Sequence, residues 1–224
     1  MVSNSNTSAN EHVNDLCDGV HRLCQGMKHF RFPFNEAELP KNGLYILFER
    51  GESAHGTDRI VRVGTHTGVN QLRSRLKQHF VNENKDRSIF RKNIGRAILN
   101  RDNDPFLAHW ELDLTAHEAK VKYSPIVDFE KQNKIEHQVT GYLQENMHFV
   151  VFPLDNKDER LHLEAKIIAT VSRCTHCRPS EGWMGMHSPK EKICESGLWL
   201  VNQLYGEPLS EYDFVRLQTV AGMV

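Results

Sequence analysis

The sequence predicts an α+β fold in which helices flank a small three-stranded sheet, antiparallel or mixed. Two short apolar segments lie on either side of turn residues early in the chain, and amphipathic helical patterns fill most of the rest. A single apolar strand returns later, at residues 148–152, and stops at Pro153. We also expect additional helices at the N- and C-terminal ends.

The first element is an amphipathic helix over residues 11–28. Apolar residues recur there every three or four positions, which places them on one helix face. They are Val13, Leu16, Val20, Leu23 and Met27. Residues 1–10 are rich in Ser, Asn and Thr, and we expect them to be disordered. Residues 11–38 then form an N-terminal helix with its lead-in.

The first two strands form a hairpin. Asn42-Gly43 is a turn signal that precedes an apolar and aromatic strand at residues 44–48. A second strand, Ile60 to Val63, follows a polar loop over residues 51–58, so the connection is predicted to be long. Gly64 ends the second strand.

The remaining elements are helices predicted from the spacing of their apolar residues. They are expected at residues 70–81, 88–100, 130–145, 158–173 and 189–204. The chain accordingly divides into a core over residues 39–205 and a C-terminal extension over residues 206–224.

Composition sets limits on the class of protein. Of the 224 residues, 39% are hydrophobic, and no apolar run approaches the roughly 18 residues that a membrane span needs. The five cysteines are an odd number and are scattered, which argues against a disulfide framework and favours a reducing, cytoplasmic compartment. The oligomeric state is not readable from the sequence.

The charge distribution is uneven although the net charge is only −1. The segment from Arg59 to Arg101 holds eleven basic residues against Glu83 and Asp86, a local net charge of +9. Such a concentration is typical of a protein that binds a phosphate backbone. The alternative is a set of solvated helix faces.

Two residues of the helix at 70–81 stand out. Arg75 and His79 are one turn apart and lie together on one border of its apolar face. A cation and a proton carrier in that position would face an adjacent cleft. The alternative is a surface arginine with a boundary histidine.

Glu164 lies inside the apolar arc of the helix at 158–173. A carboxylate is rarely buried unless it is paired or bound to a metal, because the loss of hydration is costly. We therefore expect Glu164 to have a partner, either a structural Arg or Lys or a metal ion.

Cys174 and Cys177 have the C-x-x-C spacing of a zinc ligand pair. His187 or Cys194 could complete four ligands. Since the sequence contains no second close pair, the alternative is two reduced, buried thiols.

Four segments together resemble the GIY-YIG nuclease superfamily, and in detail a microbial branch of it. Gly43-Leu44-Tyr45 matches the first half of the signature, and Arg62-Val63-Gly64 stands where the second half belongs. Residues 75–80, Arg-Leu-Lys-Gln-His-Phe, look like the catalytic helix of the family. Glu164 resembles its metal-binding glutamate. The similarity runs from about residue 40 to beyond residue 200.

The resemblance implies a metal-dependent endonuclease that hydrolyses phosphodiester bonds in DNA, with RNA not excluded. Tyr45 would act as general base, His79 would assist proton movement, and Arg62 and Arg75 would bind the phosphate. Glu164 would hold Mg²⁺ or Mn²⁺. Further contacts to the substrate are expected from Gly64, His66, Lys77, Arg87 and Arg91. Because these groups must surround one phosphate, the catalytic atoms should converge within about 10 Å of one point.

The sequence departs from the family pattern in two places. Arg62 replaces the second signature tyrosine, and the asparagine that usually follows the glutamate helix has no clear counterpart, Ser180 and Glu181 being the nearest polar residues. The alternative function is therefore a catalytically impaired module of the same fold that binds nucleic acid or a protein.

Overall fold

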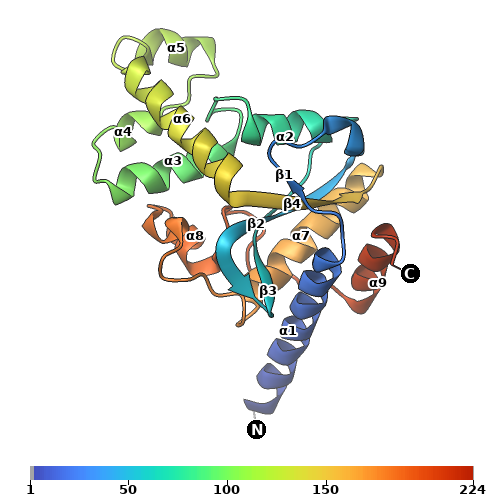
Figure 1. Cartoon of the computed structure of the whole chain (residues 1–224). Helices are drawn as coiled ribbons and strands as arrows, with labels where there is room; N and C mark the ends of the chain where they lie inside the picture. Colours follow the sequence, from blue (N-terminus) through green and yellow to red (C-terminus); the bar gives the residue numbers. More distant parts are fainter. Residues whose placement is uncertain (1–2, 224) are drawn as a thin grey trace.

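The computed structural model describes residues 3–223 (Figure 1). It contains a four-stranded antiparallel sheet in the order β1-β4-β2-β3. The strands are β1 (Phe30–Arg31), β2 (Gly43–Ala54), β3 (Thr57–Gly64) and β4 (Met147–Pro153). The sequence predicted three of them. Strand β1 was missed because two residues are too few to show an alternating pattern.

The β2–β3 hairpin has a tight turn, so the long connection predicted over residues 51–58 is wrong. Strand β2 continues to Ala54, and β3 begins at Thr57. The two turn residues, His55 and Gly56, both have positive φ angles (53° and 71°), as in the two-residue turns that suit strand twist. Polar residues and Gly51 obscured the second half of β2, where the pairing register is irregular.

Nine α-helices are described, together with two short 3₁₀ helices, η1 (Glu36–Glu38) and η2 (Met184–His187). The α-helices are α1 (Ser3–Gln25), α2 (Leu72–Phe80), α3 (Ile89–Arg101), α4 (Leu107–Trp110), α5 (His117–Tyr123), α6 (Phe129–Asn146), α7 (Lys157–Arg173), α8 (Glu191–Ser196) and α9 (Glu211–Val220). None of the helices in the described part of the chain combines the length and hydrophobicity needed to cross a bilayer.

Two helix predictions need correction. Helix α1 spans Ser3–Gln25, so it begins and ends earlier in the chain than the predicted helix over residues 11–28. Residues 1 and 2 lie outside the described residues. Helix α8 ends at Ser196 and does not reach residue 204, because Gly197 adopts a left-handed conformation (φ 69°) that terminates it.

Both faces of the sheet are covered by helices (Figure 1). Alternate residues of β2 point to opposite sides, as the pleat requires. Tyr45 and Leu47 join a core with α2, α3 and α6, whereas Leu44 and Ile46 join a core with α1, α7 and α9. Consequently α2 and α7, which carry Arg75 and Glu164, lie on opposite faces of the strands that hold Tyr45 and Arg62.

Candidate active site

Tyr45 is fully buried on β2 and lies opposite Gly64 of β3. Its phenol covers Gly64 so closely that a Cβ atom at residue 64 would collide with Tyr45 Oη. Only glycine leaves room for the phenol to lie across the neighbouring strand. The glycine of the Arg62-Val63-Gly64 segment is thus explained by the tyrosine that it faces.

His79 connects Tyr45 to helix α3. Tyr45 Oη lies 2.7 Å from His79 Nε2, and His79 Nδ1 lies 2.7 Å from Ser88 Oγ. Ser88 caps the N-terminus of α3, where its Oγ accepts a hydrogen bond from the Arg91 backbone N–H. These three side chains therefore form a continuous buried chain of hydrogen bonds.

The imidazole of His79 is neutral at neutral pH. Burial is the main cause of a pKa well below the usual value, and three nearby arginines lower it further. A neutral imidazole accepts a proton at one ring nitrogen and donates at the other. His79 Nε2 can therefore accept a hydrogen bond from Tyr45 Oη while Nδ1–H donates one to Ser88 Oγ.

Arg62 places a buried positive charge beside Tyr45. Its guanidinium carbon lies 4.8 Å from the centroid of the Phe90 ring, and Nη1 donates to the Trp199 carbonyl. Its Nε has no hydrogen-bond partner among the described residues. Burial lowers the pKa of Arg62 and the adjacent Tyr45 raises it, but a guanidinium stays charged at any ordinary pH. An unpaired N–H donor there favours binding of an anion.

Glu164 reaches from α7 to the end of β3. Its Oε1 accepts a hydrogen bond from the Thr65 backbone N–H at 3.0 Å. Burial raises the pKa of the Glu164 carboxyl, and Arg62, the Thr65 N–H and Arg75 oppose this rise. Within residues 3–223 the carboxylate forms no ion pair. The charges of Arg62 and Arg75 therefore act on the carboxylate, but neither guanidinium forms an ion pair with it.

Arg75 reaches the same region from α2. Its Nη1 donates to Gln78 Oε1 and to the Arg87 carbonyl, both at 3.1 Å. These neutral acceptors orient the guanidinium and leave its charge uncompensated. Arg75 is only partly buried, so its charge is accessible to a ligand.

Two pockets meet at Glu164. The larger has a volume of about 390 Å³ and is lined by Thr65, His66, Thr67, Gln71, Ser74, Arg75, Gln78, Leu161 and Glu164. The smaller, of about 240 Å³, is lined by Arg62, Val63, Ile89, Asn93, Glu164, Ile168, Leu200, Val201, Asn202 and Gln203. Glu164 thus lies between the pockets that contain Arg75 and Arg62. Tyr45 and His79 line neither pocket and are buried beside Arg62.

Several pocket residues escaped the sequence reasoning. Gln71, Ser74 and Gln78 share a face of α2 with Arg75, at spacings of three and four, so the helical pattern did hold a signal for them. Asn93 gave no such signal. It lies within α3, and its buried Nδ2 has no partner in the described part of the chain.

The predicted substrate-binding residues divide into two groups. His66 lines the larger pocket, where its Nδ1 lies 2.7 Å from the Gly68 carbonyl and its Nε2 accepts from the Gly43 N–H. Lys77 instead pairs with Glu36. Gly64 is covered by the Tyr45 phenol. Of Gly64, His66 and Lys77, only His66 lines the larger pocket.

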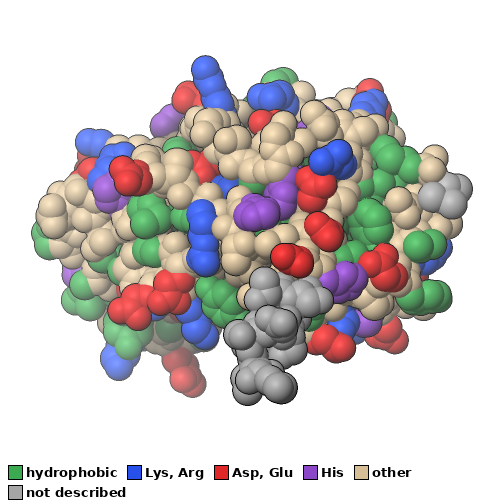
Figure 2. Space-filling model, turned by 90° about the horizontal axis from the view of Figure 1, so that it is seen from below, with side chains coloured by type: hydrophobic (Ala, Val, Ile, Leu, Met, Phe, Trp, Pro, Cys, Tyr) green, Lys and Arg blue, Asp and Glu red, His purple; other side chains and the backbone are tan. Residues whose placement is uncertain are grey.

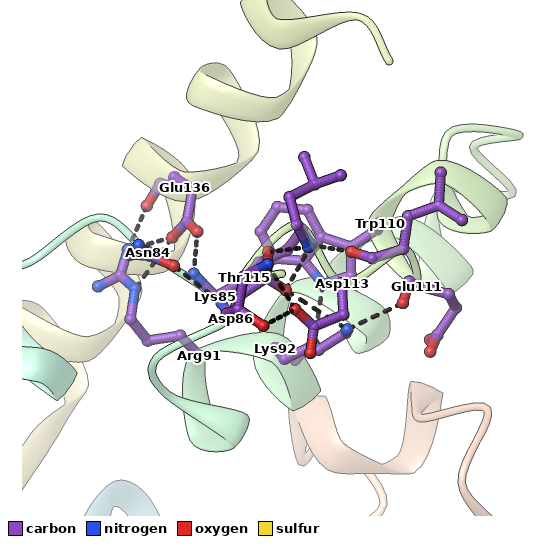
Figure 3. A network of polar contacts seen from close by, with 12 residues as sticks. Asn84, Lys85, Asp86, Arg91, Lys92, Trp110, Glu111, Asp113, Thr115 and Glu136 are labelled. Carbon is purple, nitrogen blue, oxygen red and sulfur yellow. Dashed lines mark hydrogen bonds and ion pairs between the residues drawn. The ribbon is translucent and has the colours of Figure 1, made fainter. Parts of the chain in front are cut away.

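Arg91 is held in the interior and does not reach the pocket. Its guanidinium donates to Glu136 Oε2 (Figure 3). It also donates to Thr140 Oγ1, and the side chain is fully buried. We leave it out of the substrate-binding set. Arg87 is exposed, and its carbonyl accepts from Arg75.

The cationic segment from Arg59 to Arg101 is largely neutralised inside the protein. Arg59, Arg91 and Arg96 pair with Glu52, Glu136 and Glu111, all of which lie outside the segment. Lys85 and Lys92 both approach Asp86 (Figure 3). On the face seen in Figure 2, Lys and Arg side chains are scattered among acidic ones. The local charge is therefore a poor guide to a binding surface, because most of it is compensated.

The proposed partners of Cys174 and Cys177 also need correction. The two thiols group with Cys17 and His55, and among the described residues neither His187 nor Cys194 belongs to that group. Cys194 Sγ donates instead to carbonyls such as that of Ser188. Ser180, one of the two substitutes considered for the missing asparagine, bonds to Glu52 and lines neither pocket.

The comparisons with known proteins gave one match. The family model described as a GIY-YIG domain matches residues 4–224. Neither the curated proteins nor the solved structures contain a match to the chain. The family match covers nearly the whole chain, including both segments that were expected to flank the core.

Proposed function

The chain belongs to the GIY-YIG domain family, and from this premise we propose that it is a Mg²⁺-dependent endonuclease that hydrolyses phosphodiester bonds in DNA. The observation that carries the proposal is the meeting of Tyr45, Arg62, Arg75 and Glu164 from β2, β3, α2 and α7. Segments that are far apart in the sequence contribute two cations and a carboxylate to adjoining pockets, and the buried phenol of Tyr45 lies beside Arg62. This combination suits phosphoryl chemistry, which depends on positioning and on charge stabilisation.

Arg62 and Arg75 would bind the phosphate group. Neither forms an ion pair with a carboxylate among the described residues, unlike Arg59, Arg91 and Arg96 of the same segment. Guanidinium groups donate parallel hydrogen bonds to phosphate oxygens. The unpaired Nε of Arg62 supports this role, since a buried donor without a partner is costly unless a ligand satisfies it.

Tyr45 would remove a proton from the attacking water. His79 Nε2, 2.7 Å from Tyr45 Oη, would take up the phenol proton, and the Nδ1–H of the resulting imidazolium would donate a hydrogen bond to Ser88 Oγ. Arg62 favours negative charge on the phenol oxygen as the water proton is transferred. We assign His79 to proton relay, because its Nε2 contacts Tyr45 Oη.

Glu164 would hold the cation, Mg²⁺ or Mn²⁺. One carboxylate that lacks a salt bridge and borders two pockets fits an ion that keeps several water ligands. When bound, the ion supplies neutralisation of the charge on the phosphate and the leaving oxygen. The Thr65 N–H holds Oε1, which leaves Oε2 free to turn toward a ligand.

A second function is supported by Arg62, which occupies the position of the second signature tyrosine. A module that had lost turnover would keep both arginines and bind nucleic acid without cleaving it. Such binding would survive Glu164→Ala and would not depend on divalent metal.

Matched DNA and RNA strands separate the DNA assignment from an RNA substrate. The free thiols agree with the cytoplasmic location that we propose.

The test is a cleavage assay with duplex, branched and single-stranded DNA in Mg²⁺ or Mn²⁺. Tyr45→Phe and Arg75→Ala should each slow cleavage by about 10²-fold or more, since one removes the base and the other a phosphate contact. Lys77→Ala is the matched control on α2, because Lys77 is paired with Glu36 outside the pockets. Thermal melting should show that all three variants fold. If no DNA is cut by the unaltered chain in either metal, the catalytic assignment is wrong.

A further inference from the structure

Four metal-ligating side chains gather far from the candidate active site. Cys17 of α1, His55 at the tip of the β2–β3 hairpin, and Cys174 and Cys177 after α7 have ligand atoms that all lie within 4.8 Å of one another. We propose that this group, which we call the Cys₃His cluster, binds a structural zinc ion. The three segments that it joins come together in the lower half of Figure 1, above the N-terminal end of α1.

The distances suit one tetrahedral ion. Cys17 Sγ lies 3.4 Å from Cys177 Sγ, and His55 Nε2 lies 3.3 Å from Cys174 Sγ. Tetrahedral zinc with bonds of about 2.3 Å to sulfur and about 2.0 Å to nitrogen separates its ligand atoms by roughly 3.5–3.8 Å. Small shifts toward a central ion therefore satisfy the geometry. Three thiols and one imidazole form a common set of ligands for closed, structural zinc sites.

The surroundings orient His55 for this role. Its Nε2 faces Cys174, while Nδ1 lies 3.6 Å from Asp18 Oδ1. A carboxylate behind a histidine is the usual arrangement at zinc sites, because it fixes the tautomer that leaves the other nitrogen free. The side chain of His55 is only 4% exposed, although it extends from a hairpin tip with a positive φ angle.

The loop that carries the two later cysteines is also held in place. The His176 backbone N–H donates to Cys174 Sγ at 3.4 Å, a contact that stabilises a metal-bound thiolate. Asn14, which lies three residues before Cys17 in α1, accepts a hydrogen bond from the Thr175 N–H at 3.0 Å. Asn14, Cys17 and Asp18 share one face of α1, so this face supplies a ligand and two supporting contacts.

Other nearby groups are excluded as ligands. His21 Nδ1 lies 2.9 Å from the Cys17 carbonyl, and His21 Nε2 accepts from the Ile60 N–H, so both nitrogens are engaged with the backbone. A disulfide between Cys17 and Cys177 would use two members of the cluster and leave His55 and Cys174 without a role. Zinc accounts for all four.

The ion would fasten α1 to the hairpin and to the end of α7. It would have no direct role in catalysis, since no member of the Cys₃His cluster lines either pocket beside Glu164. Its loss should therefore lower stability before it alters the chemistry of the candidate active site.

The test measures metal content in the full-length chain, purified without a histidine tag and under reducing conditions. We expect about one zinc per chain. After exchange, Co²⁺ should give the intense thiolate-to-cobalt absorption and the visible bands of a tetrahedral site. Cys17→Ser and Cys174→Ser should each lose the metal and melt at lower temperature. Cys194→Ser is the control, because Cys194 lies outside the cluster.

The Co²⁺ spectrum and the metal content of the unaltered chain keep the proposal falsifiable even if the cysteine variants fail to fold. Absence of bound zinc together with absence of a thiolate–cobalt band would overturn it. A peptide map that showed Cys17 joined to Cys177 in a metal-free protein would also overturn it, in favour of a redox pair.

Discussion

At the scale of single residues, burial determines which groups carry charge. His79 is enclosed between Tyr45, Ser88 and the Phe90 ring, and it is neutral because water cannot solvate an imidazolium there. Arg62 is buried too, yet a guanidinium does not lose its proton. Beside the phenol of Tyr45, His79 therefore provides a neutral proton acceptor and Arg62 provides a permanent positive charge.

The pH dependence of stability tests the state of His79. Its pKa in the folded protein is below the unfolded value of about 6.5, so below that pH the unfolded chain takes up a proton that the folded chain refuses. The stabilisation is complete above about pH 6.5 and is lost as the pH falls toward the folded pKa. The free energy of unfolding should drop on acidification more steeply for the unaltered chain than for His79→Gln.

Urea denaturation at several pH values between about 7.5 and 5.5 measures this difference. Other buried histidines, such as His21, are present in both proteins, so the comparison isolates residue 79. Equal slopes for the two proteins would mean that His79 titrates as it does in the unfolded chain. The proposed relay through a neutral imidazole would then lose its basis.

At the scale of elements, the site depends on how closely β2 and β3 approach. The phenol of Tyr45 crosses over Gly64, and Thr65, the next residue, turns its N–H toward Glu164 of α7. The end of β3 therefore positions both the proposed base and the proposed metal ligand. A change in the hairpin at this point should disturb both.

Gly64→Ala tests this dependence. The added methyl group would collide with the Tyr45 ring, and overpacking of this kind typically costs about 1–3 kcal/mol of stability. We expect a lower melting temperature and a loss of DNA cleavage. Gly141→Ala is the matched control, because a Cβ there meets no atom within 4 Å and the residue lies inside α6, where alanine is favourable. If Gly64→Ala melts and cleaves like the unaltered chain, the close packing of phenol on glycine is not required.

The elements also show what local patterns can predict. The strands at Tyr45 and Arg62 were predictable from short apolar runs next to turn residues, and the helices of Arg75 and Glu164 from the spacing of their apolar residues. Helix α8 was predicted too long, since the apolar residues after Gly197 suggest a continuing helix while the backbone at Gly197 turns left-handed. The register that places Tyr45 over Gly64 was not predicted and became visible only in the folded chain.

At the scale of the whole molecule, contacts between residues far apart in the sequence determine which charges are paired and which metal ligands meet, and the sequence alone did not predict these contacts. The positive segment from Arg59 to Arg101 suggested a binding surface. In the folded chain Glu136 pairs with Arg91 and Glu111 pairs with Arg96, and both glutamates come from later parts of the sequence. In the same way, Cys17 meets Cys177 across 160 residues. Charge counts and ligand spacings within one window cannot detect such partners. The candidate catalytic residues came from the family resemblance, which supplied the order of their segments, and their roles remain proposals.

The central claim is that Glu164 holds the metal for a phosphodiesterase site formed with Tyr45, Arg62 and Arg75. The most direct measurement is the single-turnover rate of DNA cleavage in Mg²⁺ by Glu164→Gln, a variant of nearly the same shape, with DNA binding measured in parallel. We predict that cleavage falls by about 10²-fold or more while DNA binding and the melting temperature are retained. Cleavage by Glu164→Gln at the rate of the unaltered chain would contradict the account.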